Sequence, residues 1–173
     1  MASATVHLSM NKAIETIRQT RKNILEYVKD LTIEQLNYIP NGFNNNIAWH
    51  LGHVVAAQQG VCYKRSGNTP MHISEEFFMA FKPETKPERF ISPDEIDEIK
   101  TLLFSTIDKL LSDYQNQIFG PHAPWVTRYG VGINNLDEAI NFLPFHEGLH
   151  FGYIMALKRT VTAATSTGEL MEP

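Results

Sequence analysis

Pro144-Phe145-His146-Glu147-Gly148-Leu149-His150 is the stretch around which the rest of the chain is organised. Its two histidines stand four residues apart in an apolar, helix-like run, so both imidazoles lean from one helix face. Two neutral imidazoles at this spacing can bind one transition-metal ion, and His-Glu-x-x-His is also the zinc-protease signature, with the glutamate as general base. Three interpretations compete: a metal site shared with other helices, a zinc protease, and histidines packed in a core.

The composition is that of an ordinary globular chain. With 173 residues, 43% of them hydrophobic, we expect a single domain over residues 1–173, with its core at about 5–162 and a mobile tail at 163–173. The 15 basic and 19 acidic residues form no long blocks, so neither nucleic acid nor a membrane is an expected partner. The single cysteine, Cys62, excludes an internal disulfide and is expected to be a buried small hydrophobic residue. We find neither a membrane-spanning run nor a signal-peptide pattern and expect a cytoplasmic protein.

Hydrophobic periodicity predicts an all-α chain with four long amphipathic helices. They are expected over residues 6–28, 47–64, 93–116 and 135–161. The connections are expected to hold short helices over 33–38 and 75–81, a surface loop over 82–91 and a long loop over 119–132 with a short extended piece. Capping patterns begin at Thr32 and Ser92, and Pro144 should kink the last helix or shift its start. Four helices with two long crossover connections describe a four-helix bundle.

A second pair of histidines, His50 and His53, lies near the start of the second long helix. The surrounding residues are apolar almost all round, so these imidazoles need a partner and are either hydrogen-bonded core residues or metal ligands. Because the last helix offers His146 and His150, the ligand interpretation is favoured. Three histidines leave coordination positions open, as at a catalytic ion, where a bound water or thiol loses its proton near neutral pH. All-nitrogen ligation suits zinc, nickel, copper or iron, of which we expect zinc or nickel.

Three other histidines carry weaker expectations. His7 and His72 lie near a terminus and in a loop, and both are expected at the surface. His122 lies in the long loop before the last helix, where it could line the mouth of a pocket.

Two motifs about a hundred residues apart, Asn46–His53 and Phe145–Gly152, resemble those of the DinB-like metal-binding four-helix family. The resemblance covers nearly the whole chain in helix count and order. It implies that His50, in the family's Trp-His-Leu slot, binds the metal with His146 and His150, and that His53 lies beside the metal or in its pocket. It also implies a homodimer and, from relatives with assigned reactions, a low-molecular-weight thiol as cofactor.

The expected function is that of a metal-dependent enzyme. Its divalent metal, held by three histidines, would activate a thiol for transfer to a small electrophilic substrate, or a water for hydrolysis of that substrate. The candidate catalytic residues are Glu147 and His53. The alternative is a non-enzymatic stress-response helical module with a structural metal or none. The zinc-protease interpretation is weaker, because the extended motif needs glycine and histidine where the chain has Tyr153 and Ala156.

Overall fold

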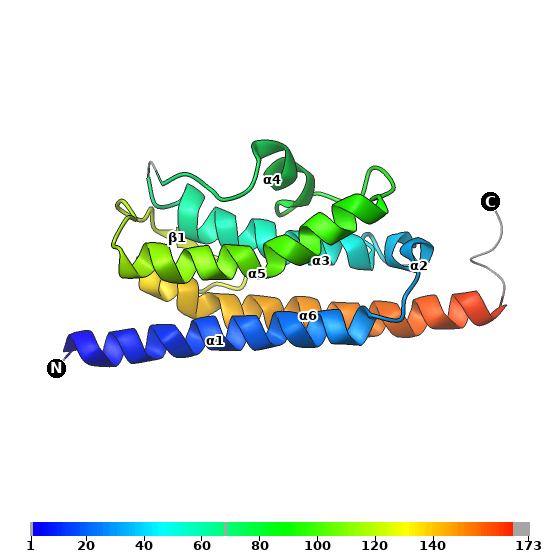
Figure 1. Cartoon of the computed structure of the whole chain (residues 1–173), viewed down its shortest axis with the longest axis horizontal. Coiled ribbons are helices and arrows are strands. Elements are labelled where there is room, and N and C mark those ends of the chain that lie inside the picture. Colours follow the sequence, from blue (N-terminus) through cyan, green and yellow to red (C-terminus); the bar gives the residue numbers. More distant parts are fainter. Residues whose placement is uncertain (1, 68, 168–173) are drawn as a thin grey trace.

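Four long helices form the body of the molecule in the computed structural model, which describes residues 2–67 and 69–167, with side chains from residue 10 to 164. They are α1 (Ala2–Val28), α3 (Ile47–Gln59), α5 (Pro93–Gln115) and α6 (Leu136–Thr167). Helix α1 lies along α6, α6 contacts α3, α3 contacts α5, and α5 contacts α1 (Figure 1). This arrangement confirms the predicted all-α fold and leaves an interior that side chains from all four helices can reach.

The connections hold the shorter elements. Helix α2 (Ile33–Asn37) follows α1, and α4 (Glu75–Phe81) packs on α3. The predicted extended piece is an antiparallel pair of two-residue strands, β1 (Trp125–Val126) and β2 (Gly132–Ile133). The second long helix does not stay α-helical to its end, because its last turn, η1 (Gly60–Lys64), is a π-helix. Such wide turns are rare and occur often at functional sites.

Side-chain caps begin the helices where the sequence predicts them. Both expected capping boxes are present, with Gln35 N donating to Thr32 Oγ1 at 3.2 Å and Glu95 N donating to Ser92 Oγ at 3.3 Å. At the start of α3, Trp49 N donates to Asn46 Oδ1 at 2.8 Å. The caps satisfy backbone groups that the helix cannot pair itself, and the last one sets where the histidine-bearing helix begins.

The ends of the outer helices differ from the prediction. Helix α1 begins at Ala2, and α6 continues to Thr167 instead of ending near Val161. The tail predicted at 163–173 is therefore helical up to 167, and its remainder lies outside the described residues. Helix α6 includes Pro144 in its interior, so the proline does not shift the start of the helix. Burial of Val161 and Ala164 explains why the helix continues.

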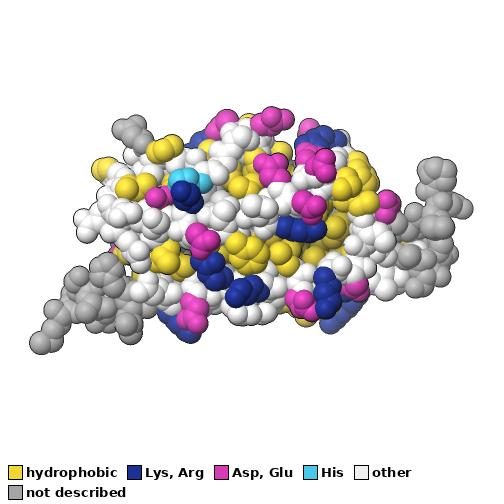
Figure 2. Space-filling model, viewed as in Figure 1, with side chains coloured by type: hydrophobic (Ala, Val, Ile, Leu, Met, Phe, Trp, Pro, Cys, Tyr) yellow, Lys and Arg dark blue, Asp and Glu magenta, His cyan; other side chains and the backbone are white. Residues whose placement is uncertain are grey.

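The core consists of the apolar stripes of the four helices and the side of α4 that faces α3. Phe78 and Phe81 of α4 are buried and anchor this segment on the body. The face seen in Figure 2 carries basic and acidic side chains interspersed with apolar ones. None of the helices described combines the length and the apolar character that a membrane span requires.

Candidate metal centre

Three histidines from two helices meet at the side of the bundle. His53 of α3 and His146 and His150 of α6 each offer one ligand atom, and these three atoms lie within 4.8 Å of one another. The ring centroids of His53 and His150 are 4.5 Å apart, as are those of His146 and His150. The two helices thus supply a set of nitrogen donors that could bind one ion.

His53 is held in place by the close approach of α4 to α3. A Cβ added to Gly52 would lie 2.5 Å from the ring of Phe81, so a glycine is needed at this contact. The approach brings Phe81 O to 2.7 Å from His53 Nδ1. Because a carbonyl oxygen only accepts, Nδ1 carries the proton and Nε2 keeps its lone pair. A hydrogen bond of this kind orients a metal-binding imidazole.

His50, expected from the resemblance to be a ligand, lies beside the cluster and contacts one of its members. His50 Nδ1 is 2.8 Å from His150 Nδ1, so one of these nitrogens donates to the other. The ring of Tyr153 stacks on His50, with centroids 5.6 Å apart. The structure therefore brings His53, His146 and His150 together as donors, and gives His50 a hydrogen bond to His150. The three donors that the structure groups and the three ligands that the resemblance implies have His146 and His150 of α6 in common.

The four imidazoles are neutral at physiological pH. Burial lowers the pKa of His50 to about 3, of His53 to about 4 and of His146 to about 3, and it lowers the pKa of His150 still further. Neighbouring positive charge, including that of Arg128, adds to the lowering for the three clustered histidines. Neutral imidazole is the form that binds metals, so no proton has to be removed first.

The donor set fits a divalent transition metal. His146 Nδ1 is buried and finds no hydrogen-bond partner among the described residues. A buried polar nitrogen without a partner is costly, and a metal ion bound nearby would use such a lone pair. Three neutral nitrogens match the preference of zinc, nickel, copper or iron.

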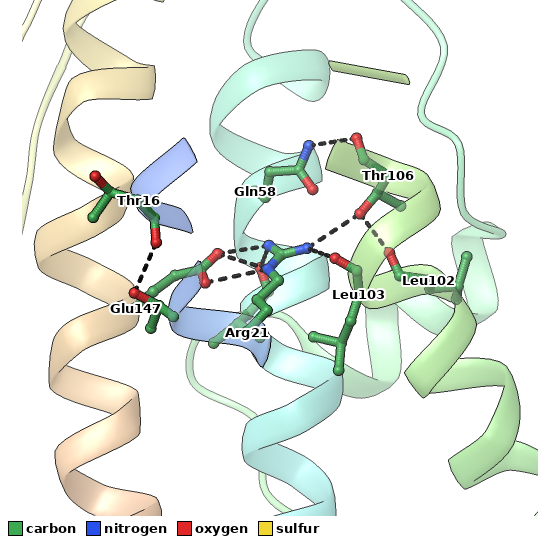
Figure 3. A network of polar contacts seen from close by, with 9 residues as sticks. Thr16, Arg21, Gln58, Leu102, Leu103, Thr106 and Glu147 are labelled. Carbon is green, nitrogen blue, oxygen red and sulfur yellow. Dashed lines mark hydrogen bonds and ion pairs between the residues drawn. The ribbon is translucent and has the colours of Figure 1, made fainter. Parts of the chain in front are cut away.

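Glu147, the candidate general base, points away from the histidines into the bundle. Its carboxylate is fully buried and accepts hydrogen bonds from Arg21 Nη2 at 2.6 Å and from Arg21 Nε at 2.9 and 3.2 Å (Figure 3). Burial raises the pKa of Glu147, and the Arg21 guanidinium opposes that rise. A carboxylate committed in this way is not available as a base, so the zinc-protease interpretation loses its catalytic group.

The guanidinium of Arg21 binds groups on three other helices. It donates to Glu147 of α6, to Leu103 O of α5 at 2.8 Å and to Val54 O of α3 at 3.1 Å, with Thr106 Oγ1 of α5 at 3.3 Å (Figure 3). All five N–H groups of the guanidinium are used. Arg21 is not among the residues predicted from the sequence, although its position on the apolar stripe of α1 was a signal. It stands four residues after Ile17 and three before Ile24, where a solvent-facing arginine would not lie.

A cavity of about 1470 Å³ opens over the histidine cluster. Its wall is partly aromatic and partly charged, with side chains from α3, α6, the strand pair and the loops at residues 42–45 and 83–88. The lining includes His50, His53, His146, His150, Trp49, Trp125, Arg128, Tyr129, Phe142 and Tyr153. The cavity exceeds the usual range of small-molecule sites, roughly 300–1,000 Å³, and so has room for two small reactants.

His72, His122 and Cys62 lie outside this cavity. His122 Nε2 lies 2.9 Å from Val61 O, and His122 does not line the cavity, so it does not take the place at a pocket mouth that its loop position allowed. His72 is half-buried beside Asp113 instead of lying free on the surface. The side chain of His7 lies outside those described. Cys62 is fully buried, and burial raises its thiol pKa, which confirms it as an unreactive core residue.

Comparison with known proteins bears on the family and not on the reaction. Among curated proteins, no sequence matches the chain. The family model described as the DinB superfamily matches residues 16–154, a span that includes Arg21, Glu147 and all three clustered histidines. The match covers most of the chain and agrees with the resemblance of its two histidine motifs. The chain therefore belongs to the DinB superfamily.

Proposed function

We propose that the chain is a metal-dependent enzyme in which His53, His146 and His150 hold a divalent transition metal, zinc or nickel. In this proposal a thiol or a water is activated for transfer to a small electrophilic substrate or for its hydrolysis. One observation carries the proposal: three neutral imidazoles converge at a large cavity, and one buried nitrogen among them has no partner. Neutral nitrogen donors that converge in this way, one of them without a protein partner, suit a bound ion.

The protein groups have separate tasks in this proposal. Phe81 O fixes the tautomer of His53, and the hydrogen bond between His50 and His150 orients the His150 ring. The aromatic wall around Trp49 and Tyr153 binds the apolar part of a substrate and limits the water around it. The chemistry that a divalent ion supplies at this position is a lowered pKa of a coordinated thiol or water.

The size of the cavity supports a reaction with two small reactants, of which one is a low-molecular-weight thiol. We also propose that the protein is cytoplasmic and acts as a homodimer. Support for the dimer comes from α6, where Phe145 is 50% and Tyr153 55% exposed, with Gly148 and Gly152 open between them. An exposed apolar helix face of this kind suits a second copy of the chain.

Elemental analysis of the purified protein is the first test. We expect about one zinc or nickel ion per chain, from the count of three histidines in one cluster. His146→Ala should lose the ion, because it removes one ligand from the set. A screen of low-molecular-weight thiols against small electrophiles, with His146→Ala as the inactive reference, then tests the reaction. Protein that lacks stoichiometric metal after growth in zinc and nickel, or equal metal content in the variant, overturns the proposal.

A chelation melt separates the enzyme from a module with a structural metal. The buried Arg21–Glu147 network ties four helices together without an ion, so we expect chelation to leave a folded protein. Structural zinc sites behave differently, because their domains unfold when the metal is removed. Complete loss of helical signal on chelation at room temperature would favour the structural module.

A further inference from the structure

The wall of the cavity carries more basic than acidic side chains, and not every basic side chain has an acidic partner. Its basic side chains are those of Lys64, Arg65, Lys86 and Arg128, and its acidic ones those of Glu84 and Glu88. Lys64 binds Glu75 outside the cavity at 3.0 Å, and Arg65 stacks on the Trp125 ring at 4.3 Å. These two cations are engaged by the protein itself, whereas Lys86 and Arg128 form no ion pair with a described residue.

Arg128 stands on a rigid turn between β1 and β2. Gly130 N donates to Thr127 O at 3.0 Å and closes the turn, with Gly130 at a φ of 77° that suits glycine. Thr127 Oγ1 accepts from Tyr129 N and Val131 N, at 3.3 and 3.1 Å. The Tyr129 ring packs edge-on against Phe145 of α6, with centroids 5.2 Å apart. The turn is thus braced from within and seated on the helix that bears two of the clustered histidines.

The guanidinium of Arg128 is exposed in the cavity and has no hydrogen bond or ion pair with any described residue. It lines the same cavity as His53, His146 and His150, and the turn that carries it packs through Tyr129 on Phe145, the residue before His146. The cavity that holds the histidine cluster therefore carries net positive charge before any metal binds.

We propose that Arg128 recognises a carboxylate on one of the reactants, so that the protein selects an anionic small molecule. This inference rests on the proposed function, since it assigns the chemistry of a ligand in the same cavity. An arginine fork pairs with a carboxylate through two parallel N–H···O bonds, which fixes both the charge and the direction of the ligand. Two aromatic residues of the same cavity, Tyr129 and Trp49, would contact the apolar remainder of such a molecule.

Two matched pairs of small ligands test the proposal and identify the source of the carboxylate. In the first pair, benzoate stands for an anionic substrate and benzamide for a neutral one. In the second pair, 3-mercaptopropionate stands for an anionic thiol and 2-mercaptoethanol for a neutral one. Affinities are measured by calorimetry or ligand-observed NMR on zinc-loaded and on metal-free protein. The variants are Arg128→Gln, the charge-retaining Arg128→Lys, and Arg159→Gln as control, which makes the same change at an exposed position of α6 outside the cavity.

We expect the wild type to bind at least one of the anionic ligands about tenfold more tightly than its neutral partner, the scale of one charge-assisted contact. Arg128→Gln should abolish that preference, Arg128→Lys should keep part of it, and Arg159→Gln should keep all of it. Preference in the benzoate pair alone assigns the carboxylate to the substrate, and preference in the thiol pair alone assigns it to the thiol.

Failure of this inference is distinct from failure of the proposed function. Equal affinity for anionic and neutral ligands, no detectable affinity for either anion, or an unchanged preference in Arg128→Gln overturns the role of Arg128. Metal content is measured on the same samples. If metal does not bind, the proposed function fails, while the preference of the metal-free protein for benzoate still decides the role of Arg128.

Discussion

Two buried polar regions begin at neighbouring residues of α6 and differ in how completely their hydrogen bonds are made. Glu147 turns into the bundle and meets Arg21, whose N–H groups are all used. His146, about 100° away around the helix, turns to the cavity with a buried nitrogen that has no partner among the described residues. A saturated network stabilises one arrangement of helices, whereas an unsaturated cluster is prepared for a ligand.

Breaking the saturated region should have the largest effect on folding. Glu147→Ala or Arg21→Ala leaves one charge buried without its partner, and we expect a loss of about 3–5 kcal/mol in the free energy of unfolding. Urea denaturation of metal-free protein, followed by circular dichroism, measures this loss. The exposed pair between Lys12 and Glu15 provides the control, since Lys12→Ala should change the stability little.

A double variant sharpens this first prediction. Replacing both members, Arg21→Met with Glu147→Leu, removes the uncompensated charge and should recover much of the lost stability. The remaining polar partners of Arg21, such as Val54 O, then decide how complete the recovery is. Single variants that lose less than about 1 kcal/mol would mean that the pair is not the buried anchor described here.

Breaking the unsaturated region should affect metal binding and not folding. His53→Ala or His146→Ala removes one of three ligands, and we expect metal affinity to fall by more than about a hundredfold, beyond the range for groups that only orient a ligand. The metal-free variants should remain folded, because the only hydrogen bond that either imidazole makes to a described residue is that of His53 to Phe81 O of α4. Competition with a colorimetric zinc chelator measures the affinity. Equal affinity in His146→Ala and the wild type would separate the cluster from any metal site.

The two histidines of α3 allow a finer comparison within the cluster. His50 contacts His150 but is not one of the three grouped donors, so His50→Phe should weaken metal binding by only about 10–100-fold and keep the stoichiometry. The same chelator competition, run beside His53→Ala, ranks the two positions. A larger loss in His50→Phe than in His53→Ala would return His50 to the ligand set implied by the family resemblance.

Sequence periodicity was sufficient for the helices of this fold. The apolar stripes and the capping boxes at Thr32 and Ser92 are local signals, and the structure confirms them. The π-helical turn after Gln59 and the continuation of α6 past Val161 were missed. Both depend on packing against distant elements, which a local pattern does not encode.

The candidate site was predictable only in part, for a related reason. The pair on α6 follows from its spacing, but His50 and His53 are only three residues apart and both lean toward the same partner helix. What distinguishes them is the carbonyl of Phe81, which Gly52 allows to approach. Arg21 and Glu147 are separated by 126 positions in the chain, so only the tertiary structure pairs them.

The pH dependence of stability gives the smallest expected effect and compares the same two regions by charge. Burial lowers the pKa of His146 from 6.5 to about 3 in the folded chain. Between these values the unfolded chain binds a proton that the folded chain does not, so the stability contributed by the neutral imidazole is present above pH 6.5 and is lost as the pH falls. Glu147, whose pKa is raised, acts in the opposite direction.

Comparing metal-free wild type with His146→Leu isolates the histidine contribution from that of Glu147 and every other group. Urea denaturation at pH 7.5, 6.5 and 5.5 should show a shallower loss of stability in the variant below pH 6.5. The difference is at most about 1.4 kcal/mol per pH unit for one histidine. Parallel curves for the two proteins would mean that His146 is protonated as easily in the folded chain as in water. That result would mean that burial does not keep the His146 imidazole neutral below pH 6.5.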